Sequence, residues 1–353
     1  MTAAPSPAPP AVELVGVTRS FGSVRAVDDV TLSLPAGGVM ALLGPSGCGK
    51  TTTLRLVAGF EVPDAGEVHL AGEVVAGGGR WVPPERRRVG MVFQQLALFP
   101  HLDVAGNVGY GLRGRSRPER RARVGELLDL VGLAPRQLVG PAPLVSGQAD
   151  QLSGGQAQRV ALARALAPAP AVVLLDEPFS SLDVSLREEV RAEVRAILRA
   201  AGATALLVTH DQDEALALGD QVAVMLGGRL AQVAPPEEVY RRPASAGVAA
   251  FLGDTNLFAG DLAAGLLDTP IGRLALDGPA GPATGLVRPE DLDVEEDPAG
   301  DGRVVEVVYY GHDQVVTVAL PGGTTVRARL HARRRLDPGT TVRVAARAAY
   351  RLP

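Results

Sequence analysis

Three features are scarce in this sequence of 353 residues, and each shortage excludes a class of protein. Cys48 is the one cysteine, so no disulfide can form within the chain, and a lone cysteine suits a reducing compartment. Aromatic residues make up only 4% of the chain, which argues against a stacking surface for single-stranded nucleic acid. Positive charge is not in excess either: the net charge is −4 and both signs are dispersed, so we expect no nucleic-acid partner.

Long hydrophobic runs are also missing. No stretch of about 18 apolar residues occurs, and the best candidate, residues 160–175, is interrupted by Arg164, Pro168 and Pro170. Residues 1–10 are rich in proline and alanine and lack the basic start and apolar centre of a signal peptide, so we expect a disordered tail there. We therefore expect a chain that is soluble by itself and reaches a membrane only through a partner.

A motif for binding phosphate is present near the N-terminus. Residues 44–51 have the sequence GPSGCGKT, which fits the pattern G-x-x-x-x-G-K-[ST]. Residues 38–43 predict a buried strand before it, and residues 52–58 predict a helix after it. Glycines let the loop fold around an anion, Lys50 can reach the β- and γ-phosphates, and the Thr51 hydroxyl can ligate Mg²⁺. The alternative is a chance glycine-rich turn, which the strand–loop–helix context disfavours.

Three further apolar runs predict strands, and each ends at a polar residue. Fully apolar runs are typical of a parallel sheet covered on both faces, where ligands bind beyond the carboxyl ends of the strands. A helical pattern at 185–200 separates two of them. The runs, with the polar residues at their ends, are 89–93 with Gln94, 171–175 with Asp176 and Glu177, and 204–209 with His210.

The two carboxylates at 176 and 177 suit nucleotide hydrolysis. Asp176 can hold Mg²⁺ through water, and Glu177 can orient or deprotonate an attacking water. Taken alone, such a pair could equally mark the start of a loop. Together with the phosphate loop, it predicts a nucleotide hydrolase.

A second anion site is predicted at residues 152–156, with the sequence LSGGQ. These residues precede a predicted helix at 157–166, whose N-terminus could bind an anion. Two phosphate-binding helix starts for one nucleotide make sense only if two chains share the site.

The remaining patterns complete the predicted fold class, which is α/β. Residues 12–34 and 67–75 alternate as antiparallel strands do, and 104–167 has helical spacing. From about 260 to 353, short valine-rich runs separated by glycine and proline predict a small β domain, with a hairpin formed by 315–320 and 324–330.

Taken in order, these motifs resemble those of the ATP-binding subunits of ABC transporters over residues 12–258. The matching elements are the phosphate loop at 44–51, Gln94, LSGGQ at 152–156, Asp176-Glu177, Ser181-Leu182-Asp183 and His210. The resemblance implies a P-loop ABC-type domain over 11–245 with an antiparallel β subdomain and a helical subdomain at about 95–167. A small OB-like β-barrel domain would follow over 246–353.

The resemblance also implies the roles of individual residues around ATP and Mg²⁺. Phe21, which alone would be taken for a core residue, would stack on adenine. His210, where a lone histidine is more often structural, would hold the γ-phosphate, and Gln94 would touch Mg²⁺ and water. The implied catalytic residues are Glu177, His210 and Gln94; the implied metal ligands are Thr51, Gln94 and Asp176. The implied nucleotide contacts are Phe21, Gly44, Pro45, Ser46, Gly47, Cys48, Gly49, Lys50, Thr51, Thr52, Ser153, Gly154, Gly155, Gln156 and Asp183. Of these, Ser153 and Gly155 would reach the γ-phosphate from a second copy, and Asp183 would act across the interface.

Four further segments resemble those of bacterial import ATPases. Residues 285–291 and 307–313 resemble parts of their OB-like tail, whereas 81–87 and 99–102 resemble the ferric-iron, polyamine, sulfate and sugar branch, with ferric iron closest. This implies a homodimer that energises ferric iron import at the cytoplasmic face of the inner membrane. Its partners would be two permease subunits and, indirectly, an extracytoplasmic substrate-binding protein.

Other interpretations remain open. The same machine could import polyamines such as spermidine or putrescine, sulfate, thiamine or a sugar. A soluble ABC ATPase of translation or DNA repair usually has tandem nucleotide domains or long coiled-coil insertions, which this chain lacks, and a P-loop kinase has no use for residues 152–156. Residues 141–150, which contain a look-alike SGQ, are predicted to be a surface insertion.

Overall fold

The computed structural model describes residues 9–133, 151–180 and 182–353. The predicted tail, for residues 1–8, and the predicted insertion at 141–150 lie outside the described residues. The chain divides into two compact units, the first reaching Pro236 and the second beginning at Glu237. The division lies ahead of the boundary predicted after residue 245. Among the described residues, no helix is long and apolar enough to span a bilayer.

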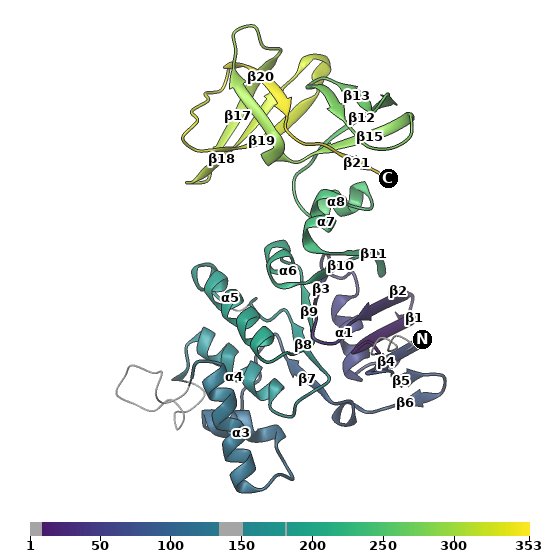
Figure 1. Ribbon diagram of the computed structural model, residues 1–353, viewed down its shortest axis with the longest axis vertical. Helices are drawn as coiled ribbons and strands as arrows, with labels where there is room; N and C mark the ends of the chain where they lie inside the picture. The colour runs from purple at the N-terminus through teal and green to yellow at the C-terminus, as the bar shows by residue number, and fades with distance from the viewer. Residues whose placement is uncertain (1–8, 134–150, 181) are drawn as a thin grey trace, which may run out of the picture. The chain divides into compact units, whose positions relative to one another are not determined.

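A six-stranded sheet forms the centre of the first unit (Figure 1). Its strands are β3 (Val39–Leu43), β7 (Val89–Val92), β8 (Val172–Asp176), β9 (Ala205–Thr209), β10 (Gln221–Leu226) and β11 (Arg229–Ala234). The order is β11-β10-β3-β9-β8-β7, with parallel pairing from β10 to β7 and an antiparallel β11 at one edge. Every residue of β3 and β9 is buried, as expected for apolar strands in a parallel sheet.

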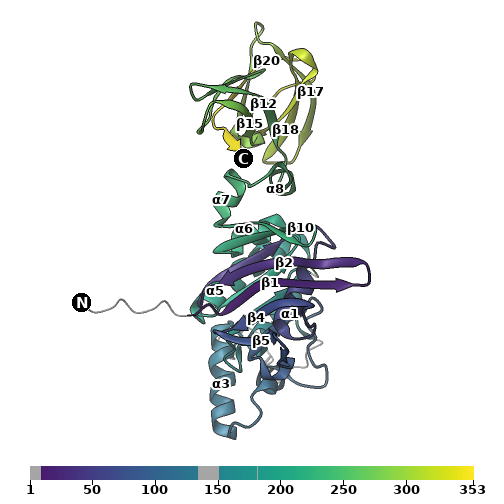
Figure 2. The same cartoon turned by 90° about the vertical axis from the view of Figure 1, so that its right-hand side faces the viewer.

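A second, antiparallel sheet lies beside it in the same unit. Its strands are β1 (Val12–Phe21), β2 (Val24–Leu34), β4 (Ala65–Leu70), β5 (Glu73–Gly77) and β6 (Arg80–Trp81), in the order β2-β1-β4-β5-β6. Figure 2 shows β1, β2 and β4 side by side, in agreement with their pairing. This is the antiparallel subdomain that the alternating pattern predicted.

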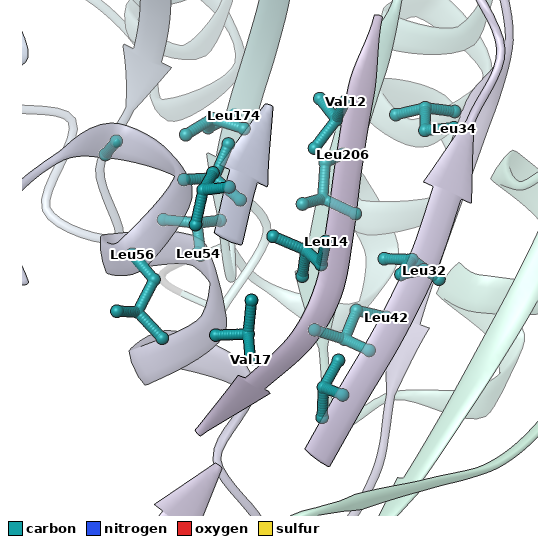
Figure 3. Packing of buried hydrophobic residues seen from close by; sticks show 14 of the residues in the cluster. Val12, Leu14, Val17, Leu32, Leu34, Leu42, Leu54, Leu56, Leu174 and Leu206 are labelled. Carbon is teal, nitrogen blue, oxygen red and sulfur yellow. The ribbon is translucent and has the colours of Figure 1, made fainter. Parts of the chain in front are cut away.

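The described helices of the first unit differ in length, from five residues in α2 to 17 in α5. They are α1 (Lys50–Ala58), α2 (Val104–Val108), α3 (Arg117–Leu130), α4 (Gly154–Leu166), α5 (Val184–Ala200) and α6 (Gln212–Leu218), with 3-10 turns η1 (Pro84–Arg86) and η2 (Gly109–Gly111). One hydrophobic core joins the two sheets and α1. It includes Leu14 and Leu32 of the antiparallel sheet, Leu54 of α1 and Leu42 of β3, and Figure 3 shows Leu14 between Leu54 and Leu42. Each such buried leucine contributes about 1.5–3 kcal/mol, so this core fixes α1 against the strands.

The C-terminal end of α1 is held by a buried cation. Arg87 is only 3% exposed, and its guanidinium donates hydrogen bonds to the carbonyls of Leu56 (2.6 Å) and Val57 (3.0 Å) and, through Nε, to that of Val82 (2.7 Å). Burial lowers the pKa of Arg87 to about 10, which leaves it protonated at neutral pH. The arginine therefore satisfies carbonyls that a helix end leaves without partners within the helix.

The second unit contains two five-stranded antiparallel sheets around one core. One sheet has the order β14-β13-β12-β15-β21 and the other β16-β20-β17-β18-β19. The hairpin of β18 and β19 is the one predicted from residues 315–330. The bounds are β12 (Asn256–Ala263), β13 (Leu266–Thr269), β14 (Gly272–Ala275), β15 (Gly281–Val287), β16 (Leu292–Glu296), β17 (Gly302–Tyr309), β18 (Asp313–Ala319), β19 (Thr325–His331), β20 (Thr341–Ala346) and β21 (Tyr350–Leu352), with η5 (Pro289–Asp291), η6 (Pro321–Gly323), α7 (Pro236–Arg241) and α8 (Ala246–Phe251).

Arg288 explains why residues before 246 belong to the second unit. The side chain is fully buried and donates hydrogen bonds to the carbonyls of Tyr240 (2.9 Å) and Ala249 (3.1 Å) in the α7–α8 segment. It also reaches the carbonyls of Gly253 and Asp254, and its guanidinium lies 4.1 Å from the centre of the Tyr240 ring. One buried side chain thus ties residues 240–254 to the β sheets.

Replacement of Arg288 by methionine is expected to destabilise the second unit by about 2–3 kcal/mol, because the buried carbonyls lose their charged donor. Urea unfolding of the full chain, followed by hydrogen exchange in residues 240–254, measures the change. Arg273→Met is the matched control, since Arg273 forms an exposed pair with Asp268 and such pairs contribute little. An equal loss of unfolding free energy in the two variants would contradict a stabilising role for the buried Arg288.

Candidate active site

The polar residues at the strand ends gather at one edge of the parallel sheet. The register pairs Val92 of β7 with Leu175 of β8, and Asp176 of β8 with Val208 of β9. Leu43 of β3 pairs with Thr209 of β9. The residues that follow these strands therefore lie near each other; they are Gln94, Glu177, His210 and the loop that starts at Gly44.

The phosphate loop depends on glycine at specific positions. Gly49 has a φ of 103°, and a Cβ there would lie 2.0 Å from the Ala26 carbonyl oxygen of β2. A Cβ on Gly44 would lie 2.3 Å from the Met225 carbonyl oxygen of β10. The backbone can fold this tightly against two strands only without side chains at these positions. The loop leads directly into α1, so the helix N-terminus adds partial positive charge where an anion would bind.

Lys50 lies inside this loop. Its side chain is buried, and Nζ donates hydrogen bonds to the carbonyls of Gly44 (2.8 Å) and Pro45 (2.9 Å). Cys48 is buried next to it, and burial raises the pKa of its thiol in spite of the nearby ammonium. Other predicted loop contacts reach the surface: Pro45, Ser46, Gly47 and Thr51 are exposed, and Thr52 is half-buried.

The two residues predicted to bind Mg²⁺ from the loop and from β8 are neighbours. The Thr51 side chain lies near enough to the Asp176 carboxylate to favour its charged form. Burial, and then the charge of Glu177, raise the pKa of Asp176, while Arg55, Thr51 and Lys50 oppose the shift. Hydroxyl and carboxylate oxygens are the ligands that Mg²⁺ prefers, and a cation beside Asp176 would favour its charged form. This donor pair fits the metal.

Glu177 is in contact with the two other predicted catalytic residues. Its Oε1 lies 3.2 Å from His210 Nδ1, and its Oε2 accepts a 3.4 Å hydrogen bond from Gln94 Nε2. The residue has a φ of 43°, in the left-handed region that non-glycine residues rarely adopt. Its backbone N–H donates to the Val208 carbonyl of β9 (2.9 Å), which holds this turn in place. The Glu177 carboxylate therefore lies between the Gln94 amide and the His210 imidazole.

The LSGGQ segment forms the start of α4. Ser153 is the N-cap residue: its Oγ accepts a hydrogen bond from Gln156 N (3.3 Å), and Gln156 Oε1 accepts one from Ser153 N (2.9 Å). Ser153 and Gly154 are exposed, whereas Gly155 is buried against Val190 of α5. Figure 1 shows α4 apart from α1, so the two helix N-termini do not meet within one chain.

Phe21 and Asp183 are both accessible for contacts outside the chain. Phe21 ends β1 with 45% of its surface exposed, and the Arg19 guanidinium lies 4.8 Å from the centre of its ring. Asp183 is the exposed N-cap residue of α5, and its side chain makes no capping hydrogen bond. Their predicted contacts with adenine and with a second copy remain predictions.

A charged network next to His210 was not predicted from the sequence. Glu214 is 3% exposed; its carboxylate accepts hydrogen bonds from Thr209 Oγ1 (2.5 Å) and Arg191 Nη2 (3.2 Å). Arg191 also donates to Asp211 Oδ2 (2.7 Å). Burial raises the pKa of Glu214. The one sequence feature that hinted at this network was the acidic segment DQDE at residues 211–214. The sequence does not reveal that an arginine of α5 pairs with these carboxylates.

Comparison with known proteins agrees with the fold and with the motifs. The ABC transporter family matches residues 27–180, and the TOBE domain family matches residues 285–350. The Fe(3+) ions import ATP-binding protein FbpC 3 of Rhodococcus jostii is 46% identical over 340 residues, which cover 94% of this chain and 95% of that protein. The FbpC protein of Serratia marcescens is 43% identical over 337 residues, with coverage of 94% and 95%.

Two solved structures are similar to about two thirds of the chain. The dimeric post-hydrolysis structure of the ATP-binding cassette MJ0796, bound to ADP and Pi, is 31% identical with a TM-score of 0.52, and the match covers 64% of this chain and 98% of that one. Clostridium perfringens cbiO1, part of the ABC transporter complex cbiONQ, is 27% identical with a TM-score of 0.58, with coverage of 65% and 90%. These matches confirm the predicted fold class. The chain belongs to the family of ATP-binding subunits of ABC transporters.

Proposed function

We propose that this chain hydrolyses ATP to energise the import of ferric iron through a membrane permease. The observation that carries the hydrolytic part is the position of Glu177, whose carboxylate contacts both Gln94 and His210 beside the phosphate loop. The ferric iron part is supported by relatives named as Fe(3+) import ATP-binding proteins, which match more than nine-tenths of the chain.

In the proposed reaction, the phosphates of ATP bind the loop at residues 44–51, where Lys50 exchanges its carbonyl partners for phosphate oxygens. Thr51, Asp176 and Gln94 would hold Mg²⁺, which neutralises charge on the phosphates. Glu177 would orient and deprotonate the attacking water, because its carboxylate lies at the strand end beside the phosphate loop, between Gln94 and His210. His210, which is 54% exposed, donates a hydrogen bond to the γ-phosphate.

The complete site requires a second copy of the chain. Ser153, Gly154, Gly155 and Gln156 begin α4 and would bind the γ-phosphate of the partner's nucleotide through the helix N-terminus. Asp183 and the ring of Phe21 supply the remaining contacts, across the interface and with adenine. The dimeric form of MJ0796 supports this arrangement.

We place the protein at the cytoplasmic face of the inner membrane, bound to two permease subunits. An extracytoplasmic substrate-binding protein would deliver the cargo on the other side. The ATPase domain is proposed to span residues 11–245, of which 237–245 pack with the second unit, and the OB-like domain residues 246–353. Closure of the dimer on ATP would move the permease through the surface at residues 94–102. ATP can drive this closure only if it binds the closed dimer more tightly than the open one.

Uptake of labelled ferric iron by cells that carry the chain with its permease tests the proposal. Accumulation is expected to require the wild-type chain and to fall to background with Glu177→Gln. The same cells are given labelled spermidine, sulfate, thiamine and a sugar. If Glu177→Gln leaves iron uptake unchanged but abolishes uptake of one of these compounds, that compound is the cargo instead. Association of the chain with ribosomes or DNA, rather than with the permease, would contradict a transport role.

A further inference from the structure

We propose that Arg187 is a positioning residue that links the segment bearing Asp183 to the segment bearing His210. The link would make the position of the γ-phosphate residue depend on contact at the dimer interface. This inference rests on the proposed function, which gives Asp183 its role across the interface and His210 its role at the phosphate.

Arg187 contacts both segments directly from α5. Its Nη2 donates a hydrogen bond to the Leu182 carbonyl (3.2 Å), next to Asp183. Its Nη1 lies 3.6 Å from Asp211 Oδ2, next to His210. The two partners use different nitrogens of one planar guanidinium, so the orientation of the group is set by both. The side chain is 27% exposed and Asp211 is 22% exposed, so water screens this pair only in part.

Arg191, one turn further along α5, strengthens the second half of the link. The residue is 9% exposed, and its Nη2 donates to Asp211 Oδ2 (2.7 Å) and to Glu214 Oε1 (3.2 Å). Residues four apart lie on the same face of a helix. Two arginines of α5 therefore hold two carboxylates, and the charges balance within a largely buried cluster.

The carboxylates in turn fix the backbone on both sides of His210. Asp211 is the N-cap residue of α6, and its Oδ1 accepts a hydrogen bond from Glu214 N (3.1 Å). Thr209 Oγ1 donates to Glu214 and accepts from Asp211 N (3.0 Å). His210 itself is largely exposed, so its position depends on these neighbours.

These contacts would transmit movement from Asp183 to His210 through α5. A helix moves as a unit, because its backbone hydrogen bonds are formed within it. Asp183 directly precedes the helix that carries Arg187 and Arg191. A displacement of Asp183 by a second copy would therefore shift Asp211 and, with it, His210 relative to Glu177. Hydrolysis would then be coupled to closure of the dimer through a contact that lies within one chain.

Hydrogen exchange in the nucleotide-free chain tests the link without relying on catalysis. Arg187→Met is expected to speed exchange about tenfold in peptides covering both 182–187 and 209–214, because both segments lose a partner. Arg199→Met is the matched control on the same helix, since Arg199 pairs with exposed Asp220 (3.5 Å), and neither peptide should change. Faster exchange in only one peptide, or in neither, would overturn the link.

Arg187→Lys is a second variant in case the methionine variant does not fold. A lysine keeps the charge but replaces the planar fork of two nitrogens with a single ammonium, which we expect to favour one of the two partners. We expect it to preserve exchange in one of the two peptides and to speed it in the other. Full protection of both would show that charge alone suffices and would overturn the role of the guanidinium.

ATP turnover gives the functional readout. Arg187→Met is expected to lower kcat about tenfold while KM for ATP changes less than twofold, because the phosphate loop is untouched. In a His210→Ala background the same change should cost less than twofold, since the link then has no histidine to position. Equal losses in both backgrounds would overturn the coupling. A chain that lacks turnover altogether but shows the exchange result would refute the proposed function and leave the link standing.

Discussion

Replacement of Glu177 by glutamine is expected to lower ATP turnover by about 10²–10⁴-fold, the range typical for loss of a general base. The amide keeps the size and can keep the contacts to Gln94 and His210, but it cannot accept a proton from water. ATP binding should persist, because the phosphate loop, Lys50 and the Thr51–Asp176 pair are unchanged. A chain that binds ATP without consuming it should accumulate as a dimer.

Phosphate release at saturating MgATP measures the first effect, and size-exclusion chromatography with and without MgATP measures the second. Glu189→Gln is the control, because Glu189 is an exposed residue of α5 and the substitution removes the same charge. A Glu177→Gln protein that retains more than a tenth of wild-type turnover would rule out Glu177 as the base. A variant that stays monomeric with MgATP would contradict the shared site.

Replacement of Gly49 by alanine is expected to abolish measurable ATP binding and to lower the free energy of unfolding by about 3–4 kcal/mol, among the largest effects of single substitutions. The new Cβ would lie 2.0 Å from the Ala26 carbonyl oxygen, a backbone atom that cannot rotate away. The φ of 103° adds strain of its own. Either the loop or β2 must move, and the loop then loses the shape that fits phosphate.

Gly47→Ala provides the comparison within the same loop. Gly47 also has a positive φ, of 79°, but a Cβ there would meet no atom of the described residues within 4 Å. We expect it to cost only about 1–2 kcal/mol of stability, the strain of a left-handed residue. Urea unfolding and titration with a fluorescent ATP analogue measure both variants. Equal stabilities would show that the contact with Ala26 is not what requires glycine at position 49.

Most strands of the first unit could be predicted from the sequence, because each is marked by a short pattern of neighbouring residues. β3, β8 and β9 are short apolar runs, and each ends at a residue with a distinctive chemistry, so the carboxyl edge of the sheet was identified before the strand order was known. The antiparallel strands followed from alternation. The fold class was confirmed, and the strand register accounts for the meeting of Glu177 with His210.

The parts that could not be predicted depend on which charged side chains become buried. Arg87, Arg191 and Arg288 do not differ in sequence pattern from the exposed arginines, yet each is buried in the structure. Their partners are mostly carbonyls or carboxylates brought close by tertiary packing, as with Arg288 and Tyr240, which are 48 positions apart. The boundary between the units also depends on a buried arginine, because Arg288 forms hydrogen bonds with α7 and α8 and so joins both helices to the second unit.

Lys50, described above with its ammonium held by the carbonyls of Gly44 and Pro45, gives the loop a property beyond its shape. The loop is organised before any nucleotide arrives, so little conformational entropy is lost on binding. Under the proposed function, however, Lys50 would have to exchange these two hydrogen bonds for phosphate oxygens. A nucleoside monophosphate offers no β-phosphate to replace them, whereas ATP and ADP do. The carbonyls of Gly44 and Pro45 would therefore compete with phosphate for the Lys50 ammonium, and we expect this competition to disfavour nucleotides with short phosphate chains.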